Sequence, residues 1–336
     1  MRIEQNYPLL NHNTFRLDVK TKYFVEYESE EDLEMLLQDE YFMSETFWHI
    51  GEGSNLLFLG DFNGIIVHSG IKGIELIRES EEYVWLKVGA SENWDQFVAY
   101  CVSKGWGGVE NLSNIPGEVG ASAYQNIGAY GVEVADCIEE VHTYFMETGT
   151  KQIFFKNDCE YAYRHSFFKE ERNKGLYYIT YVVYRVDKYP SFKLDYGNLN
   201  QHLEGNPINL QTIREAVIAV RASKLPDPNV LGNAGSFFKN PFIKASQFHR
   251  LQHDYPNMPY YSVDDEFVKI PAAWLIDQCG FKGKQLGDAA VYEKQALVIV
   301  NRGRATGEEV TLLAGEIQNA VKDKFSIELE PEVIYI

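Results

Sequence analysis

Apolar residues recur along this chain with two spacings, and the two spacings predict two kinds of element. Helical spacing marks four segments, which are 29–40, 92–105, 271–280 and 307–323. Strands are expected where β-branched and aromatic residues form short runs, in 64–69, 83–89, 176–186 and 296–300. Because the two kinds of element follow one another without strict alternation, the pattern favours an α+β protein over a doubly wound sheet.

The ends of the predicted helices are marked by particular residues. The helix in 29–40 begins after Ser29, a good side-chain cap, and its Leu33, Leu36 and Leu37 share one face. In 271–280, Pro271 is expected at the first helical position, with glycine past the end. The leucine stripe predicts a surface helix over 29–40.

The composition is that of a globular protein without a membrane span. Of 336 residues, 45% are hydrophobic, enough for a sizeable core, and the length suggests two or three domains. The longest apolar runs, such as 177–184, are far shorter than the ~20 residues that a transmembrane helix needs. The N-terminus mixes charged and polar residues where a signal peptide has an apolar stretch, so a cytoplasmic protein is expected.

Charge and cysteine content narrow the partners further. The formal net charge of −18 argues against nonspecific binding to nucleic acid or to an anionic membrane, so an anionic ligand would need a local basic pocket. The cysteines lie far apart in the chain, at Cys101, Cys137, Cys159 and Cys279. Without a Cys-x-x-Cys pair or a His/Cys cluster, we expect reduced core cysteines and no metal site.

Glycine and small polar residues gather in three segments, 51–58, 114–134 and 232–241. No G-x-G-x-x-G follows a strand and no G-x-x-x-x-G-K-[ST] occurs, so the common nucleotide-binding signatures are missing from the sequence. Glycine-rich backbone can approach a ligand closely and present N–H groups to phosphates or carbonyls. An ordinary turn explains one such segment equally well, whereas three in one chain favour a ligand site.

Seven blocks of the sequence resemble the UDP-N-acetylenolpyruvoylglucosamine reductase family, in the same order over nearly the whole chain. The blocks are "HNTF" (12–15), "GEGSNLLF" (51–58), "NIPGEVGASAYQNIGAYG" (114–131), "YRHSFFK" (163–169), "KLPDPNVLGNAGSFFKNP" (224–241), "AAWLIDQCGFKGKQLGDAAV" (272–291) and "LEPEVIYI" (329–336). A further stretch, "KLDYGNL" (193–199), resembles the longer of the family's two types, which has a tyrosine loop.

The resemblance implies an activity. The family binds FAD non-covalently, accepts a hydride from NADPH, and reduces UDP-N-acetylglucosamine enolpyruvate to UDP-N-acetylmuramate in bacterial peptidoglycan synthesis. By this resemblance the expected partners are these two small-molecule substrates, with no nucleic acid and no membrane insertion, and the protein is expected to be a monomer.

The resemblance also implies a fold, which is α+β and of the vanillyl-alcohol-oxidase type. In this FAD-binding fold two subdomains clamp the flavin and a third domain covers the substrate. The expected boundaries are 1–72 with 326–336 for the first subdomain, 73–224 for the second and 225–325 for the substrate domain. The last strand would then return to the first subdomain and carry an acid into the site.

Carried over residue by residue, the resemblance assigns three roles. The catalytic set is Arg164, Ser236 and Glu332. The flavin-binding set is Gly53, Ser54, Asn55, Ser122, Gln125, Asn126, Ile127 and Gly128. The substrate-binding set is Tyr196, Lys224, Asn240 and Gln295. Arg221 either joins this set or points outward. Alanine at 123, where the family often has proline, is expected to soften the second flavin loop.

The chemistry of the reaction explains why these residue types are needed. Hydride addition to the enolpyruvyl group leaves negative charge beside the carboxylate, which a fixed cation such as Arg164 would stabilise. The carbon then needs a proton, and the hydroxyl of Ser236 can donate it. Taken singly, Ser236 is more often a turn residue, Arg164 a surface ion-pair partner, and Glu332 a solvated carboxylate.

Two other functions are compatible with parts of the pattern. A different flavin oxidoreductase on the same fold, such as an oxidase, would keep the flavin loops without the catalytic set. A UDP-sugar-binding protein without activity would keep Tyr196 and Lys224 and need no flavin. Both are disfavoured because all three groups of residues occur together.

Overall fold

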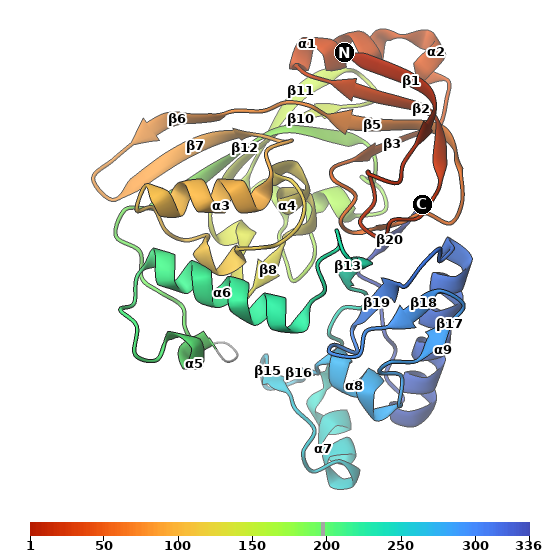
Figure 1. The fold of residues 1–336 in the computed structure, drawn as a ribbon. Coiled ribbons are helices and arrows are strands. Elements are labelled where there is room, and N and C mark those ends of the chain that lie inside the picture. The colour runs from red at the N-terminus through yellow and green to blue at the C-terminus, as the bar shows by residue number, and fades with distance from the viewer. Residues whose placement is uncertain (196–198) are drawn as a thin grey trace. The chain divides into compact units, whose positions relative to one another are not determined.

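The computed structural model describes residues 1–195 and 199–336, which divide into two compact units (Figure 1). Unit 1 comprises Met1–Tyr7, Thr21–Gly53 and Phe62–Ser223. Unit 2 comprises Pro8–Lys20, Ser54–Asp61 and Lys224–Ile336. Each unit therefore contains more than one stretch of the chain, and each has its own sheets.

Unit 1 begins with a four-stranded sheet in the order β1-β2-β5-β3. Its elements are β1 (Arg2–Pro8), β2 (Lys20–Tyr27), α1 (Glu30–Gln38), α2 (Glu40–Met43), β3 (Phe47–Ile50) and β5 (Phe62–Ser69). Strand β5 runs parallel to both β2 and β3. The Ser29 side chain accepts a hydrogen bond from the Asp32 N–H and caps α1, whose three predicted leucines are buried. The helix expected over 29–40 is thereby confirmed.

The second sheet of unit 1 has five antiparallel strands in the order β11-β10-β12-β7-β6. These strands are β6 (Ile74–Glu79), β7 (Tyr83–Gly89), β10 (Ile138–Phe145), β11 (Thr150–Phe155) and β12 (Tyr177–Asp187). Helices α3 (Trp94–Ser103) and α4 (Val119–Gln125) lie against one face of the sheet in Figure 1. The core between them includes Trp94, Phe97 and Tyr184, which are almost completely buried.

Unit 1 contains further elements, most of which are short. They are η1 (Glu110–Leu112), β8 (Gly128–Ala129), β9 (Val132–Glu133), η2 (Val134–Asp136), η3 (Lys156–Cys159), η4 (Phe167–Lys169), α5 (Leu199–Leu203) and α6 (Leu210–Lys224). Helices α5 and α6 bury Leu199, Leu203, Ile213 and Val217 in a small separate core.

Unit 2 has an antiparallel sheet in the order β13-β19-β18-β17 and a smaller sheet in the order β14-β16-β15. The strands are β13 (Gly232–Ser236), β14 (Phe242–Lys244), β15 (Tyr261–Ser262), β16 (Phe267–Lys269), β17 (Gln285–Leu286), β18 (Ala289–Val291) and β19 (Val298–Asn301). The helices are α7 (Ala245–Asp254), α8 (Ala272–Gln278) and α9 (Gly307–Phe325). The last strand, β20 (Ile334–Tyr335), pairs in parallel with β4 (Leu56–Leu57).

The predicted α+β pattern is confirmed, with two corrections at the level of single elements. Pro271 is not the first helical residue of α8 but the residue that precedes it, with extended φ and ψ of −61° and 112°. The stretch 114–134 is not a loop throughout, because it contains α4. Ala123 lies inside that helix and is fully buried, so it packs into the core instead of softening a loop.

The cysteines form no disulfide bonds. All four cysteines are free, and three are buried as expected, whereas Cys279 is partly exposed. Among the residues that the structure describes, no helix is long and apolar enough to cross a membrane.

Candidate active site

The first two glycine segments are joined by a side chain within unit 1. The N–H of Gly117 donates to Oε2 of Glu52 at 2.8 Å. Gly53 and Gly117 have φ values of +72° and +117°, which side-chain-bearing residues rarely adopt. Glycine at these two positions therefore lets the backbone of both segments turn sharply, next to one another.

Buried side chains hold the second glycine segment from within. The Nδ2 of Asn126 donates to Glu133 Oε2 at 2.9 Å and to the Ala162 carbonyl at 2.8 Å, while its Oδ1 accepts from the Ala135 N–H at 3.2 Å. The Ser122 hydroxyl lies 2.7 Å from the Val119 carbonyl and 2.8 Å from the Tyr184 hydroxyl. Since both side chains are buried and bonded inside the protein, these two residues can contact a ligand only through their backbone atoms.

Arg164 is brought to the same segment. Its residue has a positive φ of +55°, and its Nη2 donates to the Gly128 carbonyl at 2.6 Å. A Cβ atom at Gly128 would lie 2.8 Å from Nη1 of Arg164, so only glycine fits there without displacing the guanidinium. Lys169 supports both, with Nζ 2.9 Å from Gln125 Oε1 and 2.9 Å from the Arg164 carbonyl.

Arg221 is half-buried and contacts the second glycine segment. Its Nε donates to the Asn114 carbonyl at 3.1 Å, at the start of the second glycine segment. Burial lowers the pKa of the Arg221 guanidinium, as does the charge of Arg164, against the opposing effects of Tyr130 and Asp95. Both guanidinium groups stay charged at neutral pH, so a local basic site exists in a strongly acidic protein.

A second set of side chains, not foreseen from the sequence, holds Arg221 in place. Asp95 on α3 accepts from Nη1 and Nη2 of Arg214 at 2.6 and 2.7 Å, and from the Asn114 N–H at 2.5 Å. Arg214 and Arg221 share helix α6, so this carboxylate ties that helix to the turn at Asn114. Only the distance of 119 residues between Asp95 and Arg214 in the chain hid the pair from sequence reasoning.

The third glycine segment lies in unit 2 and presents Ser236 at the end of β13. Gly235 before it has a φ of +68°, and Phe237 and Phe238 after it are buried. The Phe237 carbonyl accepts from the N–H of Glu332 at 2.9 Å. Ser236 and Glu332 therefore stand on adjacent backbone segments.

Asn55 belongs to the same group in unit 2. Its Nδ2 donates to the Glu332 carbonyl at 3.0 Å, and its own carbonyl accepts from the N–H of Ile334 at 3.0 Å. The half-buried Ser54 precedes it in the chain. One end of the first glycine segment is thus part of the structure that positions Glu332.

The residues expected to bind the substrate are less closely grouped. Asn240 accepts the N–H of Ala272 at 2.9 Å and so caps α8, and Gln295 accepts the N–H of Val298 at 3.0 Å through its carbonyl. Lys224 is exposed at the end of α6. Tyr196 lies outside the residues that the structure describes.

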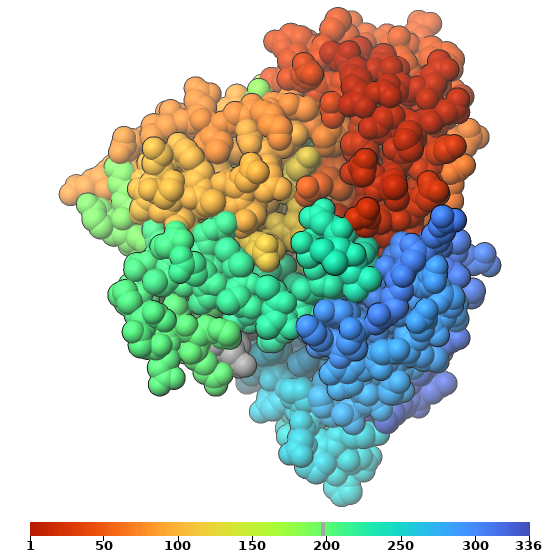
Figure 2. Space-filling model, in the orientation of Figure 1, coloured from red at the N-terminus to blue at the C-terminus, as the bar shows by residue number. Residues whose placement is uncertain are grey.

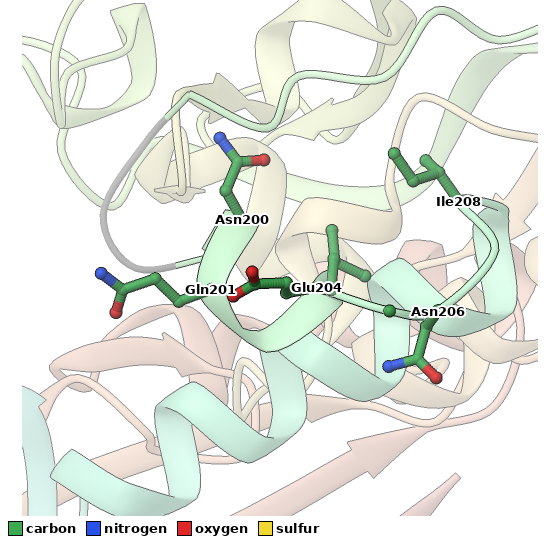
Figure 3. A pocket seen from close by; sticks show the side chains of 7 residues that line it. Asn200, Gln201, Glu204, Asn206 and Ile208 are labelled. Atoms are coloured by element: carbon green, nitrogen blue, oxygen red, sulfur yellow. The ribbon is translucent and has the colours of Figure 1, made fainter.

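An open hollow of about 470 Å³ lies elsewhere, between α5 and the start of α6 (Figure 3). Its seven lining residues fall in 200–208, a green part of the chain that reaches the surface in Figure 2. None of the seven belongs to the predicted site, and Asn200, Gln201 and Glu204 form no cluster of converging groups there.

Comparison with known proteins adds independent findings. Residues 21–152 match a family described as "FAD binding domain", and residues 227–336 match the C-terminal domain of UDP-N-acetylenolpyruvoylglucosamine reductase. The chain is 50% identical to the reductase of that name from Bacteroides fragilis over 335 residues, covering 99% of this chain and 100% of the relative. It is also 50% identical over 338 residues to the enzyme of the same name from Porphyromonas gingivalis, covering all of both chains.

A solved structure shows the same fold. The crystal structure of UDP-N-acetylenolpyruvylglucosamine reductase from Thermus caldophilus superimposes with a TM-score of 0.70 at 22% identity. The superposition covers 100% of this chain and 99% of that one. At this identity the likeness concerns the fold.

Proposed function

Because this chain belongs to the UDP-N-acetylenolpyruvoylglucosamine reductase family, we propose that Arg164, Ser236 and Glu332 carry out the chemistry of that enzyme here. The protein is an FAD-dependent oxidoreductase of peptidoglycan synthesis, with the vanillyl-alcohol-oxidase-type fold that the sequence predicted. The observation that supports the assignment is the backbone hydrogen bond between the Phe237 carbonyl and the Glu332 N–H, which joins the segment of the predicted serine to that of the predicted acid.

The glycine segments fit FAD as a ligand. Glycine stands at sharp turns of their backbone, as at Gly53 and Gly117, where N–H groups can approach a ligand closely. Arg164 and Arg221 supply positive charge next to the second segment. We assign the contacts to the backbone of Gly53, Ser54, Asn55, Ser122, Gln125, Asn126, Ile127 and Gly128. Held there, FAD would supply the chemistry of hydride transfer between NADPH and the enolpyruvyl double bond.

The protein's own residues then have two tasks. Arg164 stabilises the negative charge that develops beside the substrate carboxylate, and Glu332 is the acid on the opposite side. The Ser236 hydroxyl gives its proton to the carbon next to the carboxylate. The buried rings of Phe237 and Phe238, whose centroids are 5.1 Å apart, pack behind the serine and keep water from that side.

For the substrate we propose binding through Tyr196, Lys224, Asn240 and Gln295, with Arg221 as an additional contact to the diphosphate. The bonds accepted by Asn240 Oδ1 and by the Gln295 carbonyl leave the Nδ2 and Nε2 groups as donors to the sugar phosphate. We further propose a cytoplasmic monomer with the domains 1–72 plus 326–336, 73–224 and 225–325. The C-terminal strand β20 pairs with β4, which lies within 1–72, although both strands belong to unit 2.

An anaerobic absorbance titration tests the proposal in one cuvette. NADPH should bleach the visible flavin bands of the purified protein, and UDP-N-acetylglucosamine enolpyruvate should restore them. If only oxygen restores the colour, the protein is an oxidase on the same fold. A protein that binds no flavin even after reconstitution would contradict the assignment altogether.

A further inference from the structure

A buried histidine lies between two carboxylates in unit 1. His68 on β5 is 8% exposed, and its Nδ1 lies 2.9 Å from Glu26 Oε2 while its Nε2 lies 3.0 Å from Glu118 Oε1. A neutral imidazole has only one N–H and cannot donate to both. The arrangement therefore requires either an imidazolium at His68 or a protonated carboxyl on one side.

Glu118 connects this histidine to both glycine segments. It follows Gly117, whose N–H is bonded to Glu52 of the first segment, and it directly precedes α4. A Cβ atom at Gly51 would lie 2.9 Å from Glu118 Oε2, so this carboxylate lies close to the backbone of the first segment. His68 is therefore bonded to a side chain that lies beside both segments.

Negative charge dominates the surroundings of His68. Glu26 and Glu118 each lie beside one nitrogen of its ring, and Glu52 is close enough to Glu118 to act on the pKa of that carboxyl. The nearby cations are Arg2, with Nη1 3.7 Å from Glu26, and Lys72, which has the smallest of the named effects on the pKa of Glu118. Burial raises the pKa of Glu118, and the charge of Glu52 adds to that effect against His68.

The neighbouring ring on β3 adds no positive charge. Burial lowers the pKa of His49 to about 3, with a contribution from His68, so His49 is neutral at physiological pH. Its ring stacks on Tyr178 at 4.4 Å between centroids and bonds to the Tyr27 hydroxyl at 3.0 Å. The charge of His68 is therefore the one that faces Glu118 directly.

We propose that His68 acts as an imidazolium that positions the flavin site, clamping Glu118 and neutralising the acidic cluster so that the two glycine segments can accept the diphosphate of FAD. This inference rests on the assignment of FAD to these segments. Without the cation, three carboxylates would repel one another and the incoming phosphates.

The expected pH dependence has a definite sign. Burial acts to lower the pKa of His68, but the hydrogen bonds and charges of Glu118 and Glu26 outweigh it, so the pKa is raised. A raised pKa means that the stabilising contribution is complete below the ordinary value of about 6.5 and is lost as pH rises through the higher folded value. The raised pKa of Glu118 acts in the same direction. FAD affinity should therefore fall on the alkaline side.

The test is an FAD titration of the apoprotein, followed by flavin fluorescence between about pH 6 and pH 9. His68→Gln is expected to raise the dissociation constant at the acidic end by about tenfold and to flatten the pH dependence. The matched control is His142→Gln, since His142 is equally buried and lies 2.9 Å from Glu140 on β10, away from the glycine segments. The control should bind FAD as the wild type does, with the wild-type pH profile.

A second substitution separates charge from shape. The double variant His68→Gln/Glu118→Gln removes the cation together with one of its anions and is expected to recover most of the lost affinity, without pH dependence. A histidine needed only for packing would give a double variant at least as weak as the single one, which would overturn the proposal. If His68→Gln does not fold, Glu118→Gln alone decides, because it should move the alkaline loss of affinity to lower pH.

The variant Gly128→Ala tests the assignment of FAD to the glycine segments separately from the role of His68. The added Cβ would lie 2.8 Å from Arg164 Nη1 and 3.1 Å from the Val132 carbonyl, so it should displace the guanidinium and weaken FAD binding whatever His68 does. If Gly128→Ala loses FAD while His68→Gln binds it normally, only the role of His68 is wrong. If Gly128→Ala binds FAD normally, the flavin segments themselves have been misplaced.

Discussion

The second and third glycine segments are built from similar residues and used in different ways. In unit 1, Ser122 and Asn126 are buried and their polar atoms are bonded inside the protein. In unit 2, Ser236 is only partly buried and stands at the end of a strand, with two phenylalanines behind it. The first arrangement shapes a backbone surface, whereas the second presents a side chain.

The two segments should respond differently to amino-acid substitutions. A segment that binds through its backbone depends on every side chain that holds its conformation, so substitutions there should affect cofactor binding and stability together. A segment that presents one hydroxyl depends on that group for the chemistry and on its neighbours for placement. We call the reaction of the reduced flavin with the enolpyruvyl sugar the sugar half-reaction. Substitutions in the second segment should affect FAD binding, whereas substitutions in the third should affect the sugar half-reaction.

The largest effect is expected from Ser236→Ala. Loss of the proton donor should slow reoxidation of the flavin by the enolpyruvyl sugar by about 10²–10⁴-fold, while FAD binding and NADPH oxidation stay nearly intact. Stopped-flow absorbance measures the two half-reactions separately. Equal slowing of both would mean that the serine is structural and that the contrast between the segments is wrong.

Two buried asparagines allow a matched comparison of the segments. Asn126→Ala leaves three partners unpaired and should lower the free energy of unfolding by about 2–4 kcal/mol and weaken FAD binding. Asn233 Oδ1 accepts from the Gly235 N–H at 2.9 Å, so Asn233→Ala should spare FAD binding and slow the sugar half-reaction. Urea denaturation and FAD titration of both variants measure these effects. Loss of FAD from Asn233→Ala would contradict the separate roles of the two segments.

A smaller and pH-dependent effect is expected at Asp95. Burial acts to raise the pKa of this carboxyl, but Arg214, the Asn114 N–H and Arg221 outweigh it and hold the pKa below its ordinary value. The stability is therefore present above about pH 4 and lost as pH falls through the folded value. Asp95→Asn should cost about 1.5–3 kcal/mol of unfolding free energy at neutral pH and much less in acid. A difference that stays constant with pH would show that the ion pair is not its cause.

The smallest effect is expected from Lys169→Met. The variant removes two hydrogen bonds that support Gln125 and Arg164, so the sugar half-reaction should slow a few-fold, by about 1 kcal/mol of transition-state stabilisation. Lys174→Met is the control, because Lys174 lies over the ring of Trp48 at 5.5 Å. An effect of equal size in the control would show that Lys169 has no specific role in the site.

Local patterns were enough to predict the elements whose ends and faces are set by neighbouring residues. Ser29 with its leucine stripe predicted α1, and the aromatic and β-branched runs predicted β5, β7, β12 and β19. These predictions succeed because caps and apolar periodicity act over a few residues. The family motifs likewise assign Arg164 and Ser236 to the catalytic set, and the experiments above test their roles.

Long-range contacts decided the remaining features. Helix α4 forms in a glycine-rich stretch because the N–H groups of Val119 and Gly120 bond to the Glu92 and Ala90 carbonyls, which no local propensity reveals. The two carboxylates at His68 lie 42 and 50 residues away in the chain, so its charge could not be foreseen. Residue type and spacing specify short-range order, whereas burial and charge depend on which distant segments the fold brings together.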